Sequence, residues 1–444
     1  MQQDARGVAH SGASAFARDQ YDVAAKQFQT YVGDPVATLD AALADSPRFA
    51  SAHLFKALAL ITAAEKSLLP AVRAALRAAG ECAGSATARE RMLLAAAERL
   101  AAGDWHAGSL QLDHVLAEYP RDIVALQTGH LMDFCRGDAA TLRNRVSRVL
   151  PQWDAATPGY SHVLGMHAFG LEEMNQYAAA EATGRHALEL EPRDGWAVHA
   201  VAHVMEMQGR IDEGAAWLTG RESDWAPDNA FAFHNWWHLA LFHMDAARYG
   251  EVLALYDRHV HPAPAQLALT LVDATALLWR LHLERVDVGT RFVQLAEEWE
   301  ARLESDRGFY AFNDVHAMLA FAATGRTAAI ERQHANLAVA AAGTDANAAM
   351  SYEVGMPLAQ GIEAFGRGHY AAAVDFIEPV RPIAHRFGGS HAQRDLITLT
   401  LIEAALRGGM QKRAEHYIAE RLVHKPHNRW GLRLARRAAS LSLH

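Results

Sequence analysis

The chain has 444 residues, of which 51% are hydrophobic and 21% are charged, so it can bury a large core. Its formal net charge of −9 argues against nonspecific binding to nucleic acid or to an anionic membrane surface. Two cysteines, Cys82 and Cys135, are too few for a disulfide framework or a cysteine-rich zinc site, which favours a reducing, cytoplasmic setting. We also expect no signal peptide and no membrane span, because no uninterrupted apolar stretch is long enough.

Alanine-rich helical periodicity runs along the whole chain, broken by Gly, Pro and Asp, and no alternating strand pattern interrupts it. The sequence therefore predicts an all-α protein built from helical hairpins. We predict the first helices of successive hairpins over residues 49–64, 122–136, 159–174, 194–208, 228–244, 265–284, 309–324, 351–366 and 390–407.

The second helices carry an internal repeat. The segment YAAAEATGRHALELEP, residues 177–192, has the spacing Y-x2-A-x3-G-x2-A-L-x3-P that is typical of a tetratricopeptide repeat. Its small residues let helices approach closely, and the proline ends the helix. The same ladder recurs as Gly108, Leu112, Leu116 and Pro120, and as Ala414, Ile418, Leu422 and Pro426.

These repeats predict a tetratricopeptide-like helical-hairpin solenoid, a right-handed superhelix with a curled concave face. No linker rich in Gly, Ser or Pro divides the chain, so we expect residues 1–444 to form one continuous array. Residues 193–324 are expected to hold most of the functional site, because they carry the polar pattern described next.

Histidines recur in register with the repeat. His199 and His203 in HAVAH lie 35 residues before His234 and His238 in HNWWH. A spacing of four places each pair on one helix face, and adjacent first helices lie about 8–10 Å apart, so the four rings should face one another. Adding 35 to His238 reaches Asp273, which continues the row onto a third helix.

Further polar residues belong to the same face or to later first helices. Glu206 follows His203 by three residues, and Asn235, Trp236 and Arg280 lie on the central helices. The later residues are Asn313, Asp314 and His316 in FYAFNDVHAML, and His391, Gln393, Arg394 and Asp395 in GGSHAQRD. A solenoid that curls would bring these helices over the same cavity, although Ser390 and Gln393 also form a helix capping box.

Three functional interpretations of this pattern compete. A metal site would use His199, His203, His234, His238 and Asp273 to hold Zn, Fe or Mn, although HAVAH lacks the glutamate of the H-E-x-x-H motif. Metal-free acid/base chemistry would use His203, His238 or His316 as the proton carrier. The acidic partners for that carrier are Glu206, Asp273 and Asp314.

The third interpretation is a binding pocket without catalysis, in which polar and aromatic groups hold a ligand. Its candidate ligand-binding residues are Asn235, Trp236, Arg280, Asn313, His391, Gln393, Arg394 and Asp395. Opposed to all three is a structural role, in which the polar groups satisfy one another inside the superhelix.

Several stretches together resemble the tetratricopeptide repeat protein 38 family and its bacterial members. They are HAVAHVMEMQGRIDEGAAWL, FHNWWHLALF, DATALLWRL, NDVHAMLA, GGSHAQRD, GMHAFGLEEMNQYAAAE and SPRFASAHLFKALAL, and they span essentially the whole chain. The resemblance implies a helical solenoid but no particular reaction. It points to the histidines, Asp273, Glu206 and the other polar residues already named.

A groove rich in histidine and acid suits a small-molecule pocket better than a peptide track. We therefore expect a protein that binds a small polar or anionic molecule, with hydrolase or lyase chemistry and no nucleotide or flavin cofactor, since no such motif is present. The alternative is a noncatalytic scaffold for a peptide or protein partner. We expect no nucleic-acid or membrane partner, and a homo-oligomer is left open.

Overall fold

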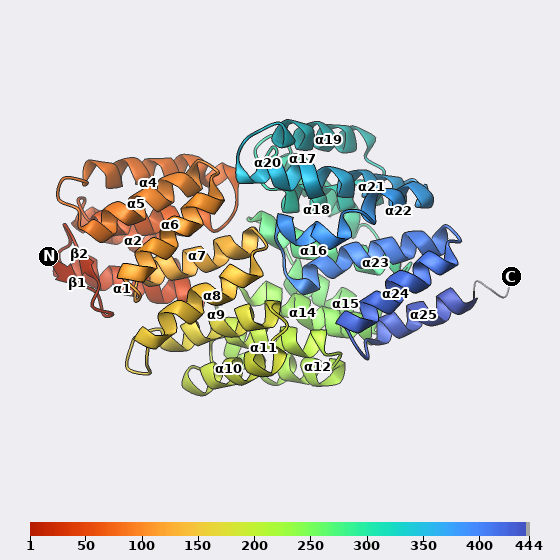
Figure 1. The fold of residues 1–444 in the computed structure, drawn as a ribbon, viewed down its shortest axis with the longest axis horizontal. Coiled ribbons are helices and arrows are strands. Elements are labelled where there is room, and N and C mark those ends of the chain that lie inside the picture. The colour runs from red at the N-terminus through yellow and green to blue at the C-terminus, as the bar shows by residue number, and fades with distance from the viewer. Residues whose placement is uncertain (441–444) are drawn as a thin grey trace. The chain divides into compact units, whose positions relative to one another are not determined.

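The computed structural model describes residues 1–440, and helices make up nearly all of the regular structure in that range (Figure 1). Its contacts divide the chain into two compact units. The first comprises Met1–Val201 with Ser223–Ala232, and the second comprises Ala202–Glu222 with Phe233 onward. The division falls inside one helix, α11 (Gly195–Met207), and the predicted single array over residues 1–444 stays a prediction.

The first unit begins with a short antiparallel pair of strands, β1 (Gln2–Gln3) and β2 (Ala9–His10). Its helices are α1 (Ala15–Thr30), α2 (Pro35–Asp45), α3 (Ala50–Ile61), α4 (Leu69–Glu81), α5 (Ala88–Ala101), α6 (Trp105–Glu118), α7 (Ile123–Cys135), α8 (Ala139–Val149), α9 (Tyr160–Glu173), α10 (Tyr177–Leu190), the first part of α11, and α13 (Glu222–Trp225). Short 3₁₀ turns cover Lys66–Leu68 and Leu150–Gln152.

The second unit contains the remaining helices. They are the end of α11, α12 (Ile211–Gly220), α14 (Ala232–Asp245), α15 (Tyr249–Leu255), α16 (Ala268–Leu283), α17 (Arg291–Arg302), α18 (Ala311–Thr324), α19 (Thr327–Ala341), α20 (Ala346–Met350), α21 (Met356–Gly366), α22 (Tyr370–Ile377), α23 (His391–Arg407), α24 (Gln411–His424) and α25 (Arg429–Ser440). Tyr256–Val260 and Ser351–Gly355 are π-helical, and Arg381–Phe387 is 3₁₀-helical.

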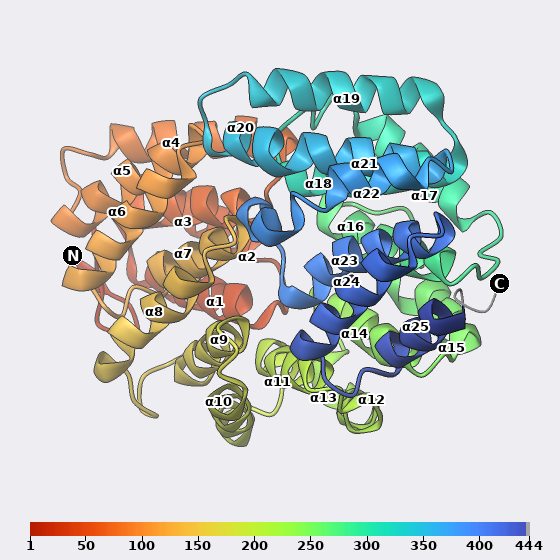
Figure 2. The ribbon, with the colours of Figure 1, turned by 45° about the vertical axis from the view of Figure 1, so that its right-hand side comes forward.

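Consecutive helices pair into hairpins in both units. In the first unit α1 packs on α2, α3 on α4, α5 on α6, and α9 on α10. In the second, α18 packs on α19, α21 on α22, and α23 on α24. The first helices also lie side by side, because α18 contacts both α16 and α21 (Figure 2). This all-α, tetratricopeptide-like hairpin architecture confirms the predicted fold class.

The second unit curls back on itself. Helix α23 contacts α16, although about a hundred residues separate them along the chain. Trp279 Nε1 donates to Thr400 Oγ1 at 2.9 Å across this contact. The expectation that later helices return to the central ones is therefore confirmed within this unit.

Each predicted first helix is present with ends shifted by a few residues, as α3, α7, α9, α11, α14, α16, α18, α21 and α23. Local signals explain many of the helix starts. Asp122 caps α7 by accepting from Ala125 N, and Ser390 with Gln393 forms the predicted capping box of α23. The helix predicted over residues 351–366 begins with a π-helical turn, which the periodicity did not indicate.

The repeat glycine of α10 shows why the ladder needs small residues. A Cβ added to Gly184 would lie 2.7 Å from Cγ2 of Val201, which no ordinary contact allows. The close approach of α10 to α11 therefore depends on this glycine.

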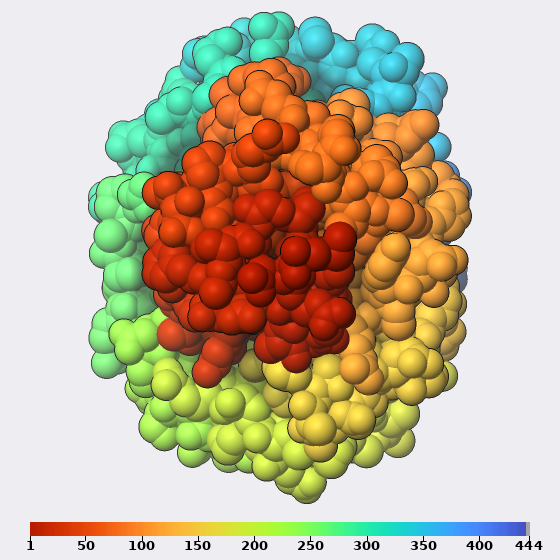
Figure 3. Space-filling model, turned by 90° about the vertical axis from the view of Figure 1, so that its left-hand side faces the viewer, coloured from red at the N-terminus to blue at the C-terminus, as the bar shows by residue number. Residues whose placement is uncertain are grey.

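The N-terminal residues of the first unit are packed, not trailing, as the red and orange surface of Figure 3 shows. His10 Nδ1 lies 2.8 Å from Ser51 Oγ, and Ser11 Oγ donates to Glu90 Oε2 at 2.7 Å. Arg89 forms a buried ion pair with Asp122 at 2.6 Å. These polar contacts fix the N-terminal hairpin on helices α3 and α5 and on the start of α7.

Within residues 1–440, we find no helix that is both long and apolar enough to cross a membrane. Cys82 and Cys135 are both buried and form no disulfide.

Candidate functional site: a buried histidine and carboxylate cluster

Three helices of the second unit bring the repeat-register residues together. The end of α11 carries His203 and, three residues later, Glu206. Helix α14 carries His234 and His238 one turn apart, and α16 carries Asp273. Residues three or four apart share a helix face, so each helix presents its polar residues toward its neighbour.

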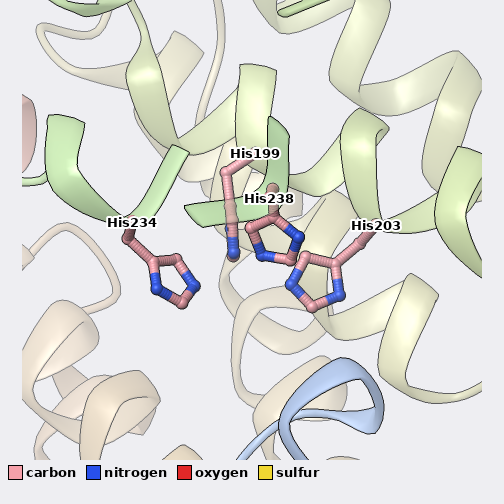
Figure 4. A group of neighbouring side chains, drawn as sticks. All are labelled: His199, His203, His234 and His238. Carbon is pink, nitrogen blue, oxygen red and sulfur yellow. The ribbon is translucent and has the colours of Figure 1, made fainter. Parts of the chain in front are cut away.

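The histidine rings lie close together and are buried. The ring centroids of His203 and His238 are 4.3 Å apart, and those of His234 and His238 are 4.9 Å apart. One ring nitrogen from each of these three residues lies within 4.8 Å of the other two (Figure 4). Each of the three residues is at most 6% exposed, so this part of the predicted cluster is present and shielded from water. His199, the fourth predicted histidine, is buried in the first unit.

Two of these histidines are paired with carboxylates. His234 Nδ1 lies 2.5 Å from Asp273 Oδ2, and His238 Nδ1 lies 3.1 Å from Glu206 Oε2. A neutral imidazole that donates its Nδ1–H to a carboxylate carries its lone pair on Nε2. Asp273 is fully buried, and its Oδ1 has no hydrogen-bond partner among residues 1–440. The pairs therefore fix both the orientation and the tautomer of the two rings.

Glu206 also belongs to a buried ion network. Its Oε1 accepts from Lys425 Nζ at 2.7 Å, and the same ammonium lies 3.4 Å from Asp395 Oδ2. Asp395 receives two hydrogen bonds from Arg421, both at 2.8 Å. This network connects the end of α24 to α11 and to the start of α23.

The charges in the network fix its ionisation. Burial raises the pKa of Glu206, but Lys425, His203 and Arg280 lower it more, so the pKa falls below its usual range. Burial also raises the pKa of Asp395, but the positive charges of Arg421 and Lys425 lower it more, so this pKa too falls below its usual range. Both carboxyl groups are therefore anionic at neutral pH, and Glu206 can accept from His238.

His238 itself stays neutral. Burial lowers its pKa well below the usual value, and the neighbouring His203 and His234 lower it further. A neutral imidazole is the form that binds a metal ion or accepts a proton. The cluster can therefore hold a cation without first releasing a proton from this ring.

Arg280 differs from the other buried arginines. Arg6, Arg89, Arg145 and Arg421 each pair with a carboxylate. The described partners of Arg280 are instead the carbonyl oxygens of Ala276 and Ala392, at 3.0 and 2.7 Å, and the ring of Trp237, whose centroid lies 5.2 Å away. Burial lowers its pKa to about 10, so it remains a cation.

Some predicted site residues line a small cavity of the second unit. His316, Gln393 and Arg394 line a largely apolar cavity of about 20 Å³ between α18, α21 and α23. His316 Nδ1 donates to the carbonyl of Phe312 at 2.7 Å, and burial lowers its pKa to about 4. Gln393 closes the capping box with Ser390, and Arg394 Nη2 lies 3.3 Å from His391 Nδ1.

The structure gives the remaining predicted residues other neighbours. Trp236 stacks on His259, with ring centroids 4.0 Å apart, and Asp314 accepts from Gln333 at 2.8 Å. Asn235 is buried in α14, whereas Asn313 is half-buried in α18. Trp236 and Asp314 therefore have neighbours that the sequence pattern did not predict.

Sequence analysis missed Lys425 and Arg421. Both residues lie on or just after a second helix, outside the first-helix register that selected the other candidates. The nearest signal was Pro426, which marks the end of a repeat and says nothing about a long-range partner. Lys425 lies more than two hundred residues after Glu206 in the chain, and the two side chains meet only because the second unit folds back on itself.

No family model matches the chain. Among solved structures, the human IFIT1 dimer with m7Gppp-AAAA is 11% identical, with 96% of this chain and 95% of that chain covered and a TM-score of 0.43. Yeast Tom70 is 10% identical over 96% of both chains, with a TM-score of 0.34. The APC/C hetero-tetramer Cut9–Hcn1 is 10% identical, covering 95% of this chain and 90% of that chain, with a TM-score of 0.34. Such low scores carry no argument about function.

Proposed function

We propose that the second unit binds a divalent transition-metal ion through His203, His234 and His238. The observation that carries this proposal is the pairing of two clustered histidines with buried carboxylates, Asp273 and Glu206. Metal-binding histidines commonly donate their other ring N–H to a carboxylate, which orients the ring and raises its basicity. Imidazole nitrogens without thiolate suit Zn²⁺ first, and also iron, better than Mg²⁺ or Ca²⁺.

The geometry of the rings suits a metal ion. The N–H groups of His234 and His238 are directed at carboxylates, so their lone pairs lie on the opposite ring nitrogens. The ring nitrogens of these two residues and of His203 lie close to one another, and the His238 ring is neutral. A cation among them would have several nitrogen ligands.

We further propose that the bound ion acts together with Arg280 on a small anionic molecule. A buried guanidinium without a carboxylate is costly, and a carboxylate or phosphate group would offset that cost through paired hydrogen bonds. Histidine ligands with one open position are the donor set of metal-assisted hydrolysis. Hydrolase chemistry is accordingly the catalytic form of the proposal.

The second candidate is a noncatalytic scaffold that binds a peptide or protein partner. The tetratricopeptide-like hairpins support it, because stacked helical repeats create extended binding surfaces. On this alternative the histidine cluster only stabilises the interior, so the protein would not bind a transition metal specifically. The cytoplasmic setting and the exclusion of nucleic acid stay predictions under both candidates.

Zinc titration of the chelator-treated full chain tests the proposal. The wild type should bind Zn²⁺, and His203→Ala/His238→Ala should weaken binding by more than about 100-fold, because both direct ligands are lost. His334→Ala is the matched control, since His334 also pairs with a carboxylate, Glu363 at 2.7 Å, but outside the cluster. Equal binding by the double variant, or no binding by the wild type, would favour the scaffold.

A further inference from the structure

The C-terminal segment of the second unit, residues 425–440, packs against the three helices that carry the histidine cluster. It consists of a short connection and the helix α25, which lies beside α24 (Figure 1). The cluster is almost completely buried, since His203 and His238 are 0% exposed and His234 is 6% exposed. A metal ion or a small molecule can therefore reach the rings only after part of the surrounding structure moves aside.

The connection before α25 covers the acidic side of the cluster. Lys425 Nζ donates to Glu206 Oε1 at 2.7 Å, and the other oxygen of this carboxylate lies 3.1 Å from Nδ1 of His238. Pro426 packs on the turn after α11, because a Cβ added to Gly209 would lie only 2.3 Å from its carbonyl oxygen. The connection therefore closes the surface behind the carboxylate that orients His238.

Helix α25 itself contacts the carboxyl ends of α14 and α16. Arg433 donates to the last carbonyl oxygens of α14, at 2.6 Å to Asp245 and at 3.2 Å to Met244. The Asp245 carboxylate in return accepts from the backbone N–H of Trp430 at 2.9 Å. Trp430 Nε1 also donates to Glu284, the C-cap residue of α16, at 2.6 Å. One terminal segment thus contacts all three helices of the cluster.

Few apolar side chains anchor this helix. Trp430 and Leu434 are the only large apolar side chains of α25 that are buried, because Leu432 is 47% exposed. The side chain of Arg437, which pairs with Glu403, is 42% exposed, and partly exposed ion pairs contribute little. A helix of 12 residues is only marginally stable by itself. Detaching α25 should therefore cost less free energy than unfolding the whole unit.

The connection also provides a hinge. His427 has a φ of 64°, in the left-handed region that residues other than glycine rarely occupy, and release of α25 would relieve this strain. The buried pair of Lys425 and Glu206 does not prevent release. Both charges regain water when they separate, whereas removing one partner would leave the other buried and unpaired.

We propose that residues 425–440 form a clasp that opens by local unfolding and gives access to the histidine cluster. The closed clasp holds the ends of α14 and α16 and covers Glu206. The open clasp exposes these helix ends, and the carboxylate behind His238, to water. As a route of entry to the metal site it rests on the proposed function, but the opening is a property of the metal-free chain and is tested there.

Amide hydrogen exchange of the metal-free full chain, followed by mass spectrometry, tests whether the clasp opens by itself. In the wild type, residues 429–440 should exchange faster than α16 and α23, because they open without global unfolding. Arg433→Met removes the contacts with the end of α14 and should speed exchange of the clasp about tenfold, with α18 and α21 unchanged. Arg332→Met is the matched control, since Arg332 forms a partly exposed ion pair with Glu300 outside the clasp.

Access to the cluster is measured on the same proteins with diethyl pyrocarbonate, which modifies accessible imidazoles, and mass spectrometry locates the modified residues. Modification of His203 and His238 should be about tenfold faster in Arg433→Met than in the wild type, in step with the exchange of the clasp. Modification of His334, whose side chain is 28% exposed, should be the same in both proteins.

Three results would overturn the proposal. The wild-type clasp could exchange as slowly as α16, or Arg433→Met could speed exchange throughout the second unit, and α25 would then be an ordinary part of the global fold. Faster exchange of the clasp with unchanged modification of His203 and His238 would mean that it does not control access. A chain that opens as expected but binds no zinc would contradict only the metal site.

Discussion

At the scale of single residues, the pair of His234 and Asp273 is the most informative contact. Asp273 is fully buried and its Oδ2 lies 2.5 Å from the histidine ring. Asp273→Asn preserves the shape but removes the charge that orients and polarises the ring. We expect zinc affinity to fall about 10- to 100-fold, the usual effect of losing a carboxylate behind a metal ligand.

Competition with a chromophoric chelator measures this change. Asp212→Asn is the control, because Asp212 is an exposed carboxylate paired with Arg429. Helical content should be unchanged in both variants. If the Asp273 variant bound zinc as tightly as the wild type, the carboxylate would have no role in the site.

A second residue-scale prediction concerns acid stability. The pKa of His316 is lowered to about 4 by burial, whereas an unfolded histidine titrates near its usual pKa of about 6.5. The unfolded chain therefore binds more protons than the folded chain between these values, and stability falls as the pH drops below about 6.5. Between pH 7 and pH 5, protonation of this one histidine in the unfolded chain should lower the free energy of unfolding by about 2 kcal/mol.

Urea unfolding at pH 7 and pH 5, with a chelator present, measures that cost. The glutamine of His316→Gln cannot be protonated. The free energy of unfolding of this variant should therefore fall by about 2 kcal/mol less than that of the wild type between pH 7 and pH 5. An identical pH dependence of the two proteins would contradict the assignment of a neutral, buried ring.

At the scale of elements, Lys425 connects the end of α24 to α11 and α23. Lys425 is 4% exposed, and its ammonium contacts both Glu206 and Asp395. Lys425→Met would leave the buried carboxylate of Glu206 without its cation, so we expect the free energy of unfolding to fall by about 3–5 kcal/mol. Lys412→Met in α24 is the control, because Lys412 is exposed.

Urea unfolding of both variants checks this prediction. Adding Glu206→Gln to the lysine variant should restore part of the lost stability, because the unpaired charge is removed. A loss below about 1 kcal/mol would place the pair among weak surface ion pairs and contradict its burial.

The elements also show how far the sequence could predict the structure. Helix existence and hairpin order were predictable, because apolar periodicity and the proline-terminated ladder are local signals. The histidine row was predictable because the repeat places His203 and His238 at equivalent positions. Lys425 and Arg421 were not, since their partners depend on how the second unit closes. Nor did periodicity indicate the separate neighbours of Trp236 and Asp314.

At the scale of the whole molecule, the proposed site couples metal binding to stability. A ligand that binds only the folded chain stabilises it, by about 2.7 kcal/mol at one hundred times the dissociation constant. Excess Zn²⁺ should therefore raise the unfolding temperature of the wild type, and His203→Ala/His238→Ala should not respond. An equal rise in both proteins would show that zinc acts elsewhere.

The most direct test of the central proposal is the metal content of the untagged chain, purified without chelator and measured by elemental mass spectrometry. We predict about one zinc, iron or manganese ion per chain in the wild type, the content of a single mononuclear site. His203→Ala/His238→Ala should contain almost none. A wild type without metal, or a double variant that retains the same amount, would contradict the metal site and leave the histidine cluster a structural feature of the second unit.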